Sequence, residues 1–412
     1  MIFATARHHR RAVFHLQDFL MRKFLAAMLI SAAPALADDT TTSTLIAEKG
    51  LGAAMEGLES SAPSPDRDMA LAAVRFLSGV EQAYQARWRI GATEPLIPAP
   101  ILGSSLPGNP SPEPMRADFV NGLAADLSAS MQSARETLPE GDAALVLRLP
   151  DLWLDVDADG RRGPSEGLLD LALMPLPEGV DGEIRFDSAD TEWLRAYTHL
   201  IEAATTLILA FDPEPALARN IELAEALREQ FSTSSPDAQS DPGMKREAEY
   251  FGPMIDRIAV VIQTLRNRPD KARISEAAQH IRAMIDANRK FWKLAGEETD
   301  NDREWIPNDR QQAALGFDIP KGAGQAWLAV LEDAEQILEG ERLIPYWRFA
   351  PGHGIDLKHW LDDPQPVDLV GWIQGSAALP HARKGKTVSR DSWREFSGIF
   401  GSRAGLYMVL FN

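Results

Sequence analysis

The segment Trp193–Phe211 constrains the fold of this chain most, because its apolar residues recur at helical spacing. The main stripe, at steps of four and three, is Trp193, Tyr197, Leu200, Ala204, Leu207 and Phe211, broadened by Leu194, Ile201 and Ile208. The preceding Asp187-Ser-Ala-Asp190 offers a variant of the helix capping box, and Pro213 and Pro215 follow as stop signals. The sequence therefore predicts a long helix that is central to the core.

Other stretches share this helical periodicity. They are 66–88, 115–138, 250–267, 272–295 and 323–340. Within residues 144–154, Leu145, Leu147 and Leu149 alternate with Val146 and Arg148 before Pro150 intervenes, so we expect a short strand or extended segment there. The exiting helix is expected over Ser165–Met174. The predicted fold class is mainly α, a multi-helix globular domain with a few short strands.

The last seventy residues have a different character. Trp347, Trp360, Trp372 and Trp393 lie among glycines and prolines, and the chain ends in the apolar run Leu406–Phe411. We expect an irregular, Trp-rich C-terminal region with short helices, loops and a terminal strand.

At 412 residues, with 45% hydrophobic and 25% charged residues, the chain has the composition of one large or two ordinary folded domains. The polar gap Ser232–Gly243 separates a helical region, 38–231, from a second, 244–412. These two regions can also form one continuous domain. We expect a Pro-rich extended connector over 95–114 and a loose, polar tether over 38–49.

Residues 1–37 read as an N-terminal extension followed by a secretory signal peptide. Met21-Arg-Lys is positively charged, 24–30 is apolar, and Ala35-Leu-Ala37 is a small-x-small cleavage signal. We expect translation to start at Met21, cleavage after Ala37, and a periplasmic or secreted location.

The composition narrows the possible partners. The formal charge of −18 disfavours nucleic acid and anionic membrane surfaces, and no second apolar run is long enough to span a membrane. The chain contains no Cys, so it has neither disulfides nor Cys-ligated zinc. A protein or glycan partner in the cell envelope fits these features.

The most specific motif is the loop from Asp155 to Glu166. It has Asp at its first, third and fifth positions (Asp155, Asp157, Asp159), Gly160 at the sixth and Glu166 at the twelfth. This is the pattern D-x-[DN]-x-[DN]-G-x5-E, and it resembles the calcium loop of the EF-hand. The resemblance implies bound calcium, with the three Asp carboxylates, the carbonyl of Arg161 and both oxygens of Glu166 as ligands.

The loop departs from paired EF-hands at its eighth position. Arg162 stands where paired loops carry an apolar residue, and the nearest second candidate, Asp300–Glu304, is followed by Trp305 in place of glycine. The pattern therefore favours a lone calcium loop used as a structural clip in an exported protein. Its resemblance covers about 12 of 412 residues and implies no activity.

The remaining polar residues suggest weaker alternatives. His199 lies on the polar side of the central helix and is expected to be solvated or ion-paired. His353, Asp356 and His359 are spaced to allow a metal or catalytic role. The acid pairs Glu297/Glu298 and Asp362/Asp363, with the C-terminal tryptophans, allow an alternative function, a periplasmic hydrolase acting on glycan or peptide.

Familiar catalytic motifs are missing: the sequence contains no G-x-S-x-G, H-E-x-x-H, P-loop or G-x-G-x-x-G. It therefore does not decide whether the protein is an enzyme. The leading hypothesis is an exported calcium-binding protein, a helical binding or envelope-associated module.

Overall fold

The computed structural model describes residues 39–94, 104–171, 176–233 and 242–411. The described chain is mainly α-helical with a few short strands, as the sequence predicts. Its longer helices are α2 (Asp39–Ser60), α3 (Pro65–Arg89), α4 (Phe119–Thr137), α6 (Ser188–Phe211), α7 (Glu214–Thr233), α8 (Pro242–Leu265), α9 (Lys271–Glu297), α10 (Ala323–Leu338) and α13 (Asp391–Phe400). Shorter helices are α5 (Leu168–Leu171), α11 (Leu357–Asp362), α12 (Leu369–Gln374) and α14 (Ala404–Leu410).

Two small antiparallel sheets accompany the helices. Strand β1 (Leu145–Arg148) pairs with β2 (Glu183–Phe186), Leu145 standing opposite Phe186. Strand β4 (His353–Ile355) lies between β3 (Ile344–Pro345) and β5 (Ala382–Lys384). The strand predicted near 144–154 is thus confirmed as β1. The last residues of that predicted segment lead into the acidic loop.

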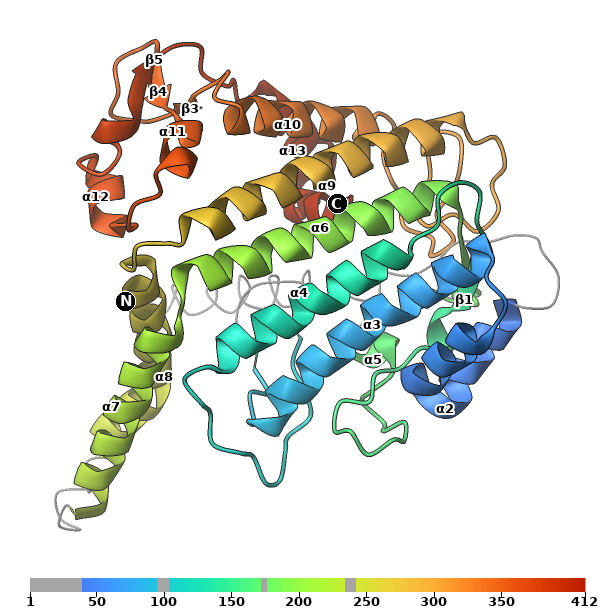
Figure 1. Ribbon diagram of the computed structural model, residues 1–412, viewed down its shortest axis with the longest axis horizontal. Coiled ribbons are helices and arrows are strands. Elements are labelled where there is room, and N and C mark those ends of the chain that lie inside the picture. Colours follow the sequence, from blue (N-terminus) through green and yellow to red (C-terminus); the bar gives the residue numbers. More distant parts are fainter. Residues whose placement is uncertain (1–38, 95–103, 172–175, 234–241, 412) are drawn as a thin grey trace, which may run out of the picture.

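Four long helices form the centre of the molecule. Figure 1 shows α3, α4, α6 and α9 side by side in that order, and α6 makes its most extensive helix contact with α9. Helix α4 packs on both α3 and α6. One cluster of buried apolar residues contains members from both sides of the 234–241 gap, among them Trp193 and Phe411.

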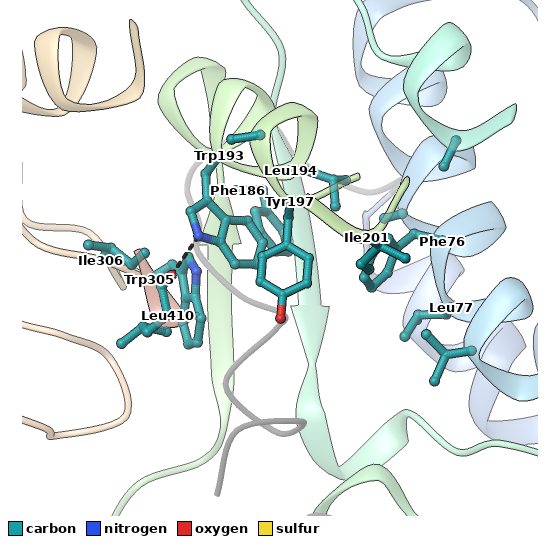
Figure 2. Close-up of a cluster of buried hydrophobic side chains, with 14 of the residues drawn as sticks. Phe76, Leu77, Phe186, Trp193, Leu194, Tyr197, Ile201, Trp305, Ile306 and Leu410 are labelled. Carbon is teal, nitrogen blue, oxygen red and sulfur yellow. Dashed lines mark hydrogen bonds between the residues drawn. The ribbon is translucent and has the colours of Figure 1, made fainter. Parts of the chain in front are cut away.

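Helix α6 begins where the sequence predicts. Asp187 accepts a hydrogen bond from the backbone N–H of Ala189 at 2.8 Å, and Asp190 accepts one from the N–H of Asp187 at 3.1 Å, which completes the capping box. The helix buries Trp193 against Phe186 and Trp305, and Tyr197 against Phe76 (Figure 2).

The predicted stripe of α6 is buried only in its first half. Ala204 is exposed and Leu207 is 39% exposed, while Thr198, Glu202 and Thr205 on the polar side are buried. The reason is that α4 and α9 both pack on α6, so its polar side also faces helices rather than solvent.

Two expectations for the chain ends are wrong. The segment 38–49 is not a loose tether, since it lies largely in α2 and buries Thr42, Ser43 and Ile46. Residues 406–410 form the end of helix α14, not a strand. A short apolar run fits either element by periodicity, and here the buried rings of Tyr407 and Phe411 pack on Phe400.

Helices α7 and α8 extend away from the other helices (Figure 1). They pack on each other, and several large apolar side chains along them are exposed: Leu223, Leu227, Tyr250, Phe251, Met254, Ile255, Ile258 and Val261. No helix in the described part of the chain combines the length and apolar character needed to cross a membrane. The signal-peptide prediction, residues 1–37, falls outside the described residues.

Candidate metal centres

The base of the acidic loop is closed by two backbone hydrogen bonds. Leu154 donates its N–H to the carbonyl of Glu166 at 2.9 Å, and Leu168 donates to the carbonyl of Leu152, also at 2.9 Å. These bonds hold the two ends of the loop side by side as a short antiparallel pair. The exit helix predicted over 165–174 is shorter in the described chain, spanning only α5, and 172–174 fall outside the described residues.

Inside the loop, the carboxylates of Asp155, Asp157 and Asp159 each place an oxygen within 4.8 Å of the others. The backbone reaches this arrangement through left-handed conformations at Ala158 (φ 59°) and Gly160 (φ 74°). Backbone N–H groups inside the loop donate to these carboxylates, for example from Gly160 to Asp155 Oδ2 at 3.0 Å and from Arg161 to Asp159 Oδ1 at 2.7 Å. Three of the five predicted ligands are therefore brought together.

The other two predicted ligands lie differently. Glu166 is 4% exposed, and its carboxylate accepts hydrogen bonds from the N–H of Val156 at 2.8 Å and of Gly163 at 2.6 Å. It therefore braces the loop backbone and is not a member of the three-acid group. Arg161 is exposed, and its backbone N–H donates a hydrogen bond to Asp159 Oδ1.

The loop is fixed to two helices. Trp153, directly before it, donates its indole N–H to the carbonyl of Ile46 and packs on Gly50, where a Cβ would lie 3.1 Å from the indole ring. Glu81 of α3 accepts a hydrogen bond from the N–H of Asp155 at 2.8 Å. Burial, with the nearby charges of Asp155 and Glu166, raises the pKa of Glu81 to about 7.

Arg162, the residue that distinguishes this loop from paired EF-hands, folds back on its own hairpin. Its guanidinium donates to the carbonyl of Pro150 at 3.0 Å. The second sequence candidate, Asp300–Glu304, does not form a similar loop, since Trp305 is buried in the core and Glu304 accepts from the N–H of Asp302 at 2.8 Å. Glu304 instead joins a different acidic group with Asp187 and Glu298.

In that group, three carboxylate oxygens lie within 4.8 Å of one another, although each acid has a structural partner. Asp187 caps α6, and Glu298 accepts from the side-chain amide of Gln311 at 3.1 Å. Burial is the main reason that the pKa values of Glu298 and Glu304 rise to about 7, and repulsion from Asp187 and Asp300 adds to it.

A third group combines histidines with a carboxylate. His199 and Glu202 of α6 meet His280 of α9, and their three ligand atoms lie within 4.8 Å of one another. His199 Nδ1 and His280 Nδ1 are 2.9 Å apart, and Arg135 of α4 forms an ion pair with Glu202. The expectation of a solvated histidine is wrong for His199, whose side chain is 15% exposed. His199 Nδ1 lies 3.8 Å from Glu202 Oε2, and this contact is an ion pair only when the imidazole is protonated.

Both imidazoles in this third group favour the neutral form. Burial first, and then the positive charges of Arg135 and Arg195, together lower the pKa of His199 to about 3. Burial and Arg135 also lower the pKa of His280. The sequence carried one signal for this group, a histidine and a glutamate three residues apart on one helix face, but gave no indication that His280 would join them.

The residues suggested for a C-terminal site do not converge. His359 contacts His381, with 3.1 Å between their Nδ1 atoms, whereas Asp356 caps α11 and pairs with Arg383 at 2.7 Å. The tryptophans are spread over separate contacts: Trp372 stacks on His381, and Trp393 packs on Phe396.

A cavity of about 330 Å³ lies elsewhere, between the end of α9 and the start of α10. Its lining residues are Trp292, Gly296, Asn308, Asp309, Arg310, Gly322, Gly324, Gln325 and Leu328. This lining includes one carboxylate and no histidine, so it lacks the acid pair that the hydrolase alternative requires.

Comparison of the chain with protein-family models, with curated proteins and with solved structures gave no match. Acidic and histidine groups in the described chain are placed so that they could hold a metal ion.

Proposed function

We propose that this protein is an exported calcium-binding protein in which the loop 155–166 acts as a structural clip within a helical, envelope-associated module. The observation that carries the proposal is the convergence of Asp155, Asp157 and Asp159 within a loop whose sequence resembles the EF-hand calcium loop. Hard carboxylate oxygens, gathered by a glycine-containing turn, are the ligands that calcium prefers.

The position of the loop supports a structural role. Its base is closed by backbone hydrogen bonds, and Trp153 and Glu81 connect it to α2 and α3. A cation held by the three acids would offset their mutual repulsion and strengthen this connection. A lone loop in an exported protein matches the weak extracellular sites, which bind calcium at about 10⁻⁴–10⁻³ M.

The test is thermal unfolding with and without calcium at about 10 mM, a concentration well above the dissociation constant expected for such sites. We expect a rise in Tm of about 1–3 °C for the wild type, because ligand binding to the folded state stabilises a chain of this size only modestly. Asp157→Ala should remove the rise.

Asp126→Ala, which removes an exposed acid on α4, is the matched control and should retain the rise. An equal rise in Tm with magnesium at the same concentration would indicate a nonspecific effect of divalent charge. An equal rise in the wild type and Asp157→Ala would refute the assignment.

A further inference from the structure

A second metal centre, chemically different from the acidic loop, is indicated where three central helices meet. His199 and Glu202 come from α6, His280 from α9 and Arg135 from α4. The side chain of Glu202 is 4% exposed and the two histidines are each 15% exposed, so the group is largely enclosed but retains access to solvent.

The distances among the three ligand atoms are compatible with one face of a tetrahedral site. His199 Nδ1 lies 2.9 Å from His280 Nδ1, and Glu202 Oε2 lies 3.8 and 3.7 Å from these two nitrogens. Ligands bound at about 2.0–2.1 Å to tetrahedral zinc are separated by about 3.3–3.4 Å. Shifts of about 0.5 Å would bring all three atoms to this separation, leaving a fourth position open.

The chemistry of the group is also selective. Two imidazole nitrogens with one carboxylate suit zinc and neighbouring first-row transition ions, whereas calcium prefers oxygens alone. We propose that His199, Glu202 and His280 form a binding site for a divalent transition-metal ion of the zinc type.

Arg135 is an alternative partner for the carboxylate of Glu202 when no metal ion is bound. In this structure its guanidinium pairs with Glu202 and neutralises that buried carboxylate. A bound dication would take over this neutralisation, and the nearby positive charge of Arg135 would weaken the affinity. The alternative explanation is therefore a purely structural ion pair with two adjacent neutral histidines.

A second pair of histidines in the described chain can be compared with the proposed site. His359 and His381 also bring two Nδ1 atoms together, at 3.1 Å, but the nearby Asp356 is engaged with Arg383 and the first turn of α11. No carboxylate of the described chain completes a three-ligand group with this pair. The two histidine pairs thus differ in whether a third ligand is present.

The experiment is a calorimetric titration of the full chain with zinc in excess calcium, which is added to occupy the acidic loop under the proposed function. We expect one zinc equivalent for the wild type and for His359→Ala/His381→Ala. His199→Ala/His280→Ala should weaken binding by more than about 100-fold, because two of three protein ligands are lost. Loss of binding only in His359→Ala/His381→Ala, or equal zinc binding in the wild type and His199→Ala/His280→Ala, would overturn the proposal.

A second measurement keeps the proposal testable if His199→Ala/His280→Ala, which alters the contact between α6 and α9, does not fold. X-ray absorption at the zinc edge is recorded on zinc-loaded His359→Ala/His381→Ala, which leaves the proposed site intact. Scattering from two imidazoles and one or two oxygens at about 2.0–2.1 Å is expected. A shell of oxygens alone, or no retained zinc, would refute the site.

Discussion

Trp193 of α6 donates its indole N–H to the carbonyl of Leu410 at 2.8 Å, a hydrogen bond between residues 217 positions apart. Figure 2 shows this bond in the buried cluster around Trp193. It connects the central helix directly to the last turn of α14. Both residues are buried, so neither group of the bond has water as a replacement partner.

Trp193→Phe should therefore destabilise the fold. The substitution leaves the Leu410 carbonyl without its donor and removes part of a large buried ring, at a combined cost of about 2–4 kcal/mol. Chemical denaturation followed by circular dichroism measures the change. Trp393→Phe is the matched control, because Trp393 is 42% exposed and should cost less than about 1 kcal/mol. Similar losses in both variants would show that the buried bond contributes little.

In the acidic loop, Glu166 and Asp157 should behave differently without calcium. Glu166→Ala removes a buried carboxylate that accepts backbone N–H bonds from Val156 and Gly163, so it should lower stability by about 2–4 kcal/mol even in chelator. Asp157 is exposed, and Asp157→Ala should have little effect in chelator. Denaturation in chelator separates the two roles; a wild-type-like Glu166→Ala would contradict the bracing role.

Arg135→Gln tests whether Arg135 and a bound metal ion compete for the carboxylate of Glu202. Without metal, the variant leaves a buried carboxylate without its cation, so its Tm should fall. With zinc, the lost positive charge should strengthen binding by roughly tenfold or more and raise Tm further than in the wild type. Thermal unfolding of both proteins with and without zinc gives the comparison. If zinc raises Tm less in Arg135→Gln than in the wild type, Arg135 does not oppose the metal.

The Asp187–Glu298–Glu304 group predicts a pH-dependent stability. Burial, with repulsion from Asp187 and Asp300, raises the pKa of Glu304 from 4.5 to about 7. Below about pH 4.5 its carboxyl is protonated in the folded and unfolded states, so no stability is lost there. As pH rises towards 7, only the unfolded state ionises freely, and the folded state loses relative stability.

Glu304→Gln, which stays neutral and keeps an acceptor for the Asp302 N–H, should therefore be more stable than the wild type at pH 8 and similar at pH 4.5. The gain has an upper limit of about 3 kcal/mol. Denaturant midpoints at the two pH values measure it, with the exposed Glu297→Gln as control. A gain at pH 4.5 that equals the gain at pH 8 would rule out this ionisation as its cause.

Local signals in the sequence predicted much of the helical content. The capping box at Asp187 and the apolar periodicity after it place α6 correctly, because both depend on residues within a few positions of each other. The same holds for α3, α9 and α10 and for the convergence of three acids in the loop 155–166. The loop motif works as a predictor since its ligands are close in sequence.

The polar side of α6 shows where such reasoning fails. Thr198 and Thr205 lie outside the apolar stripe, yet both are buried where α4 and α9 pack on α6. Their hydroxyls donate to carbonyls of their own helix, at 2.8 Å to Arg195 and 3.0 Å to Ile201, so burial leaves them satisfied. A polar helix face satisfied in this way can pack on other helices. Periodicity alone cannot distinguish it from a solvated face.

The sequence by itself therefore determined most of the long helices, the cap at Asp187 and the acidic loop, but not α2, α7 or α14. Tertiary structure alone decided that His280 meets His199, 81 positions away, that Arg135 pairs with Glu202, and that Trp193 reaches Leu410. The physical reason is that backbone conformation follows from neighbouring residues, whereas the contact between two helix faces depends on how all the helices pack together.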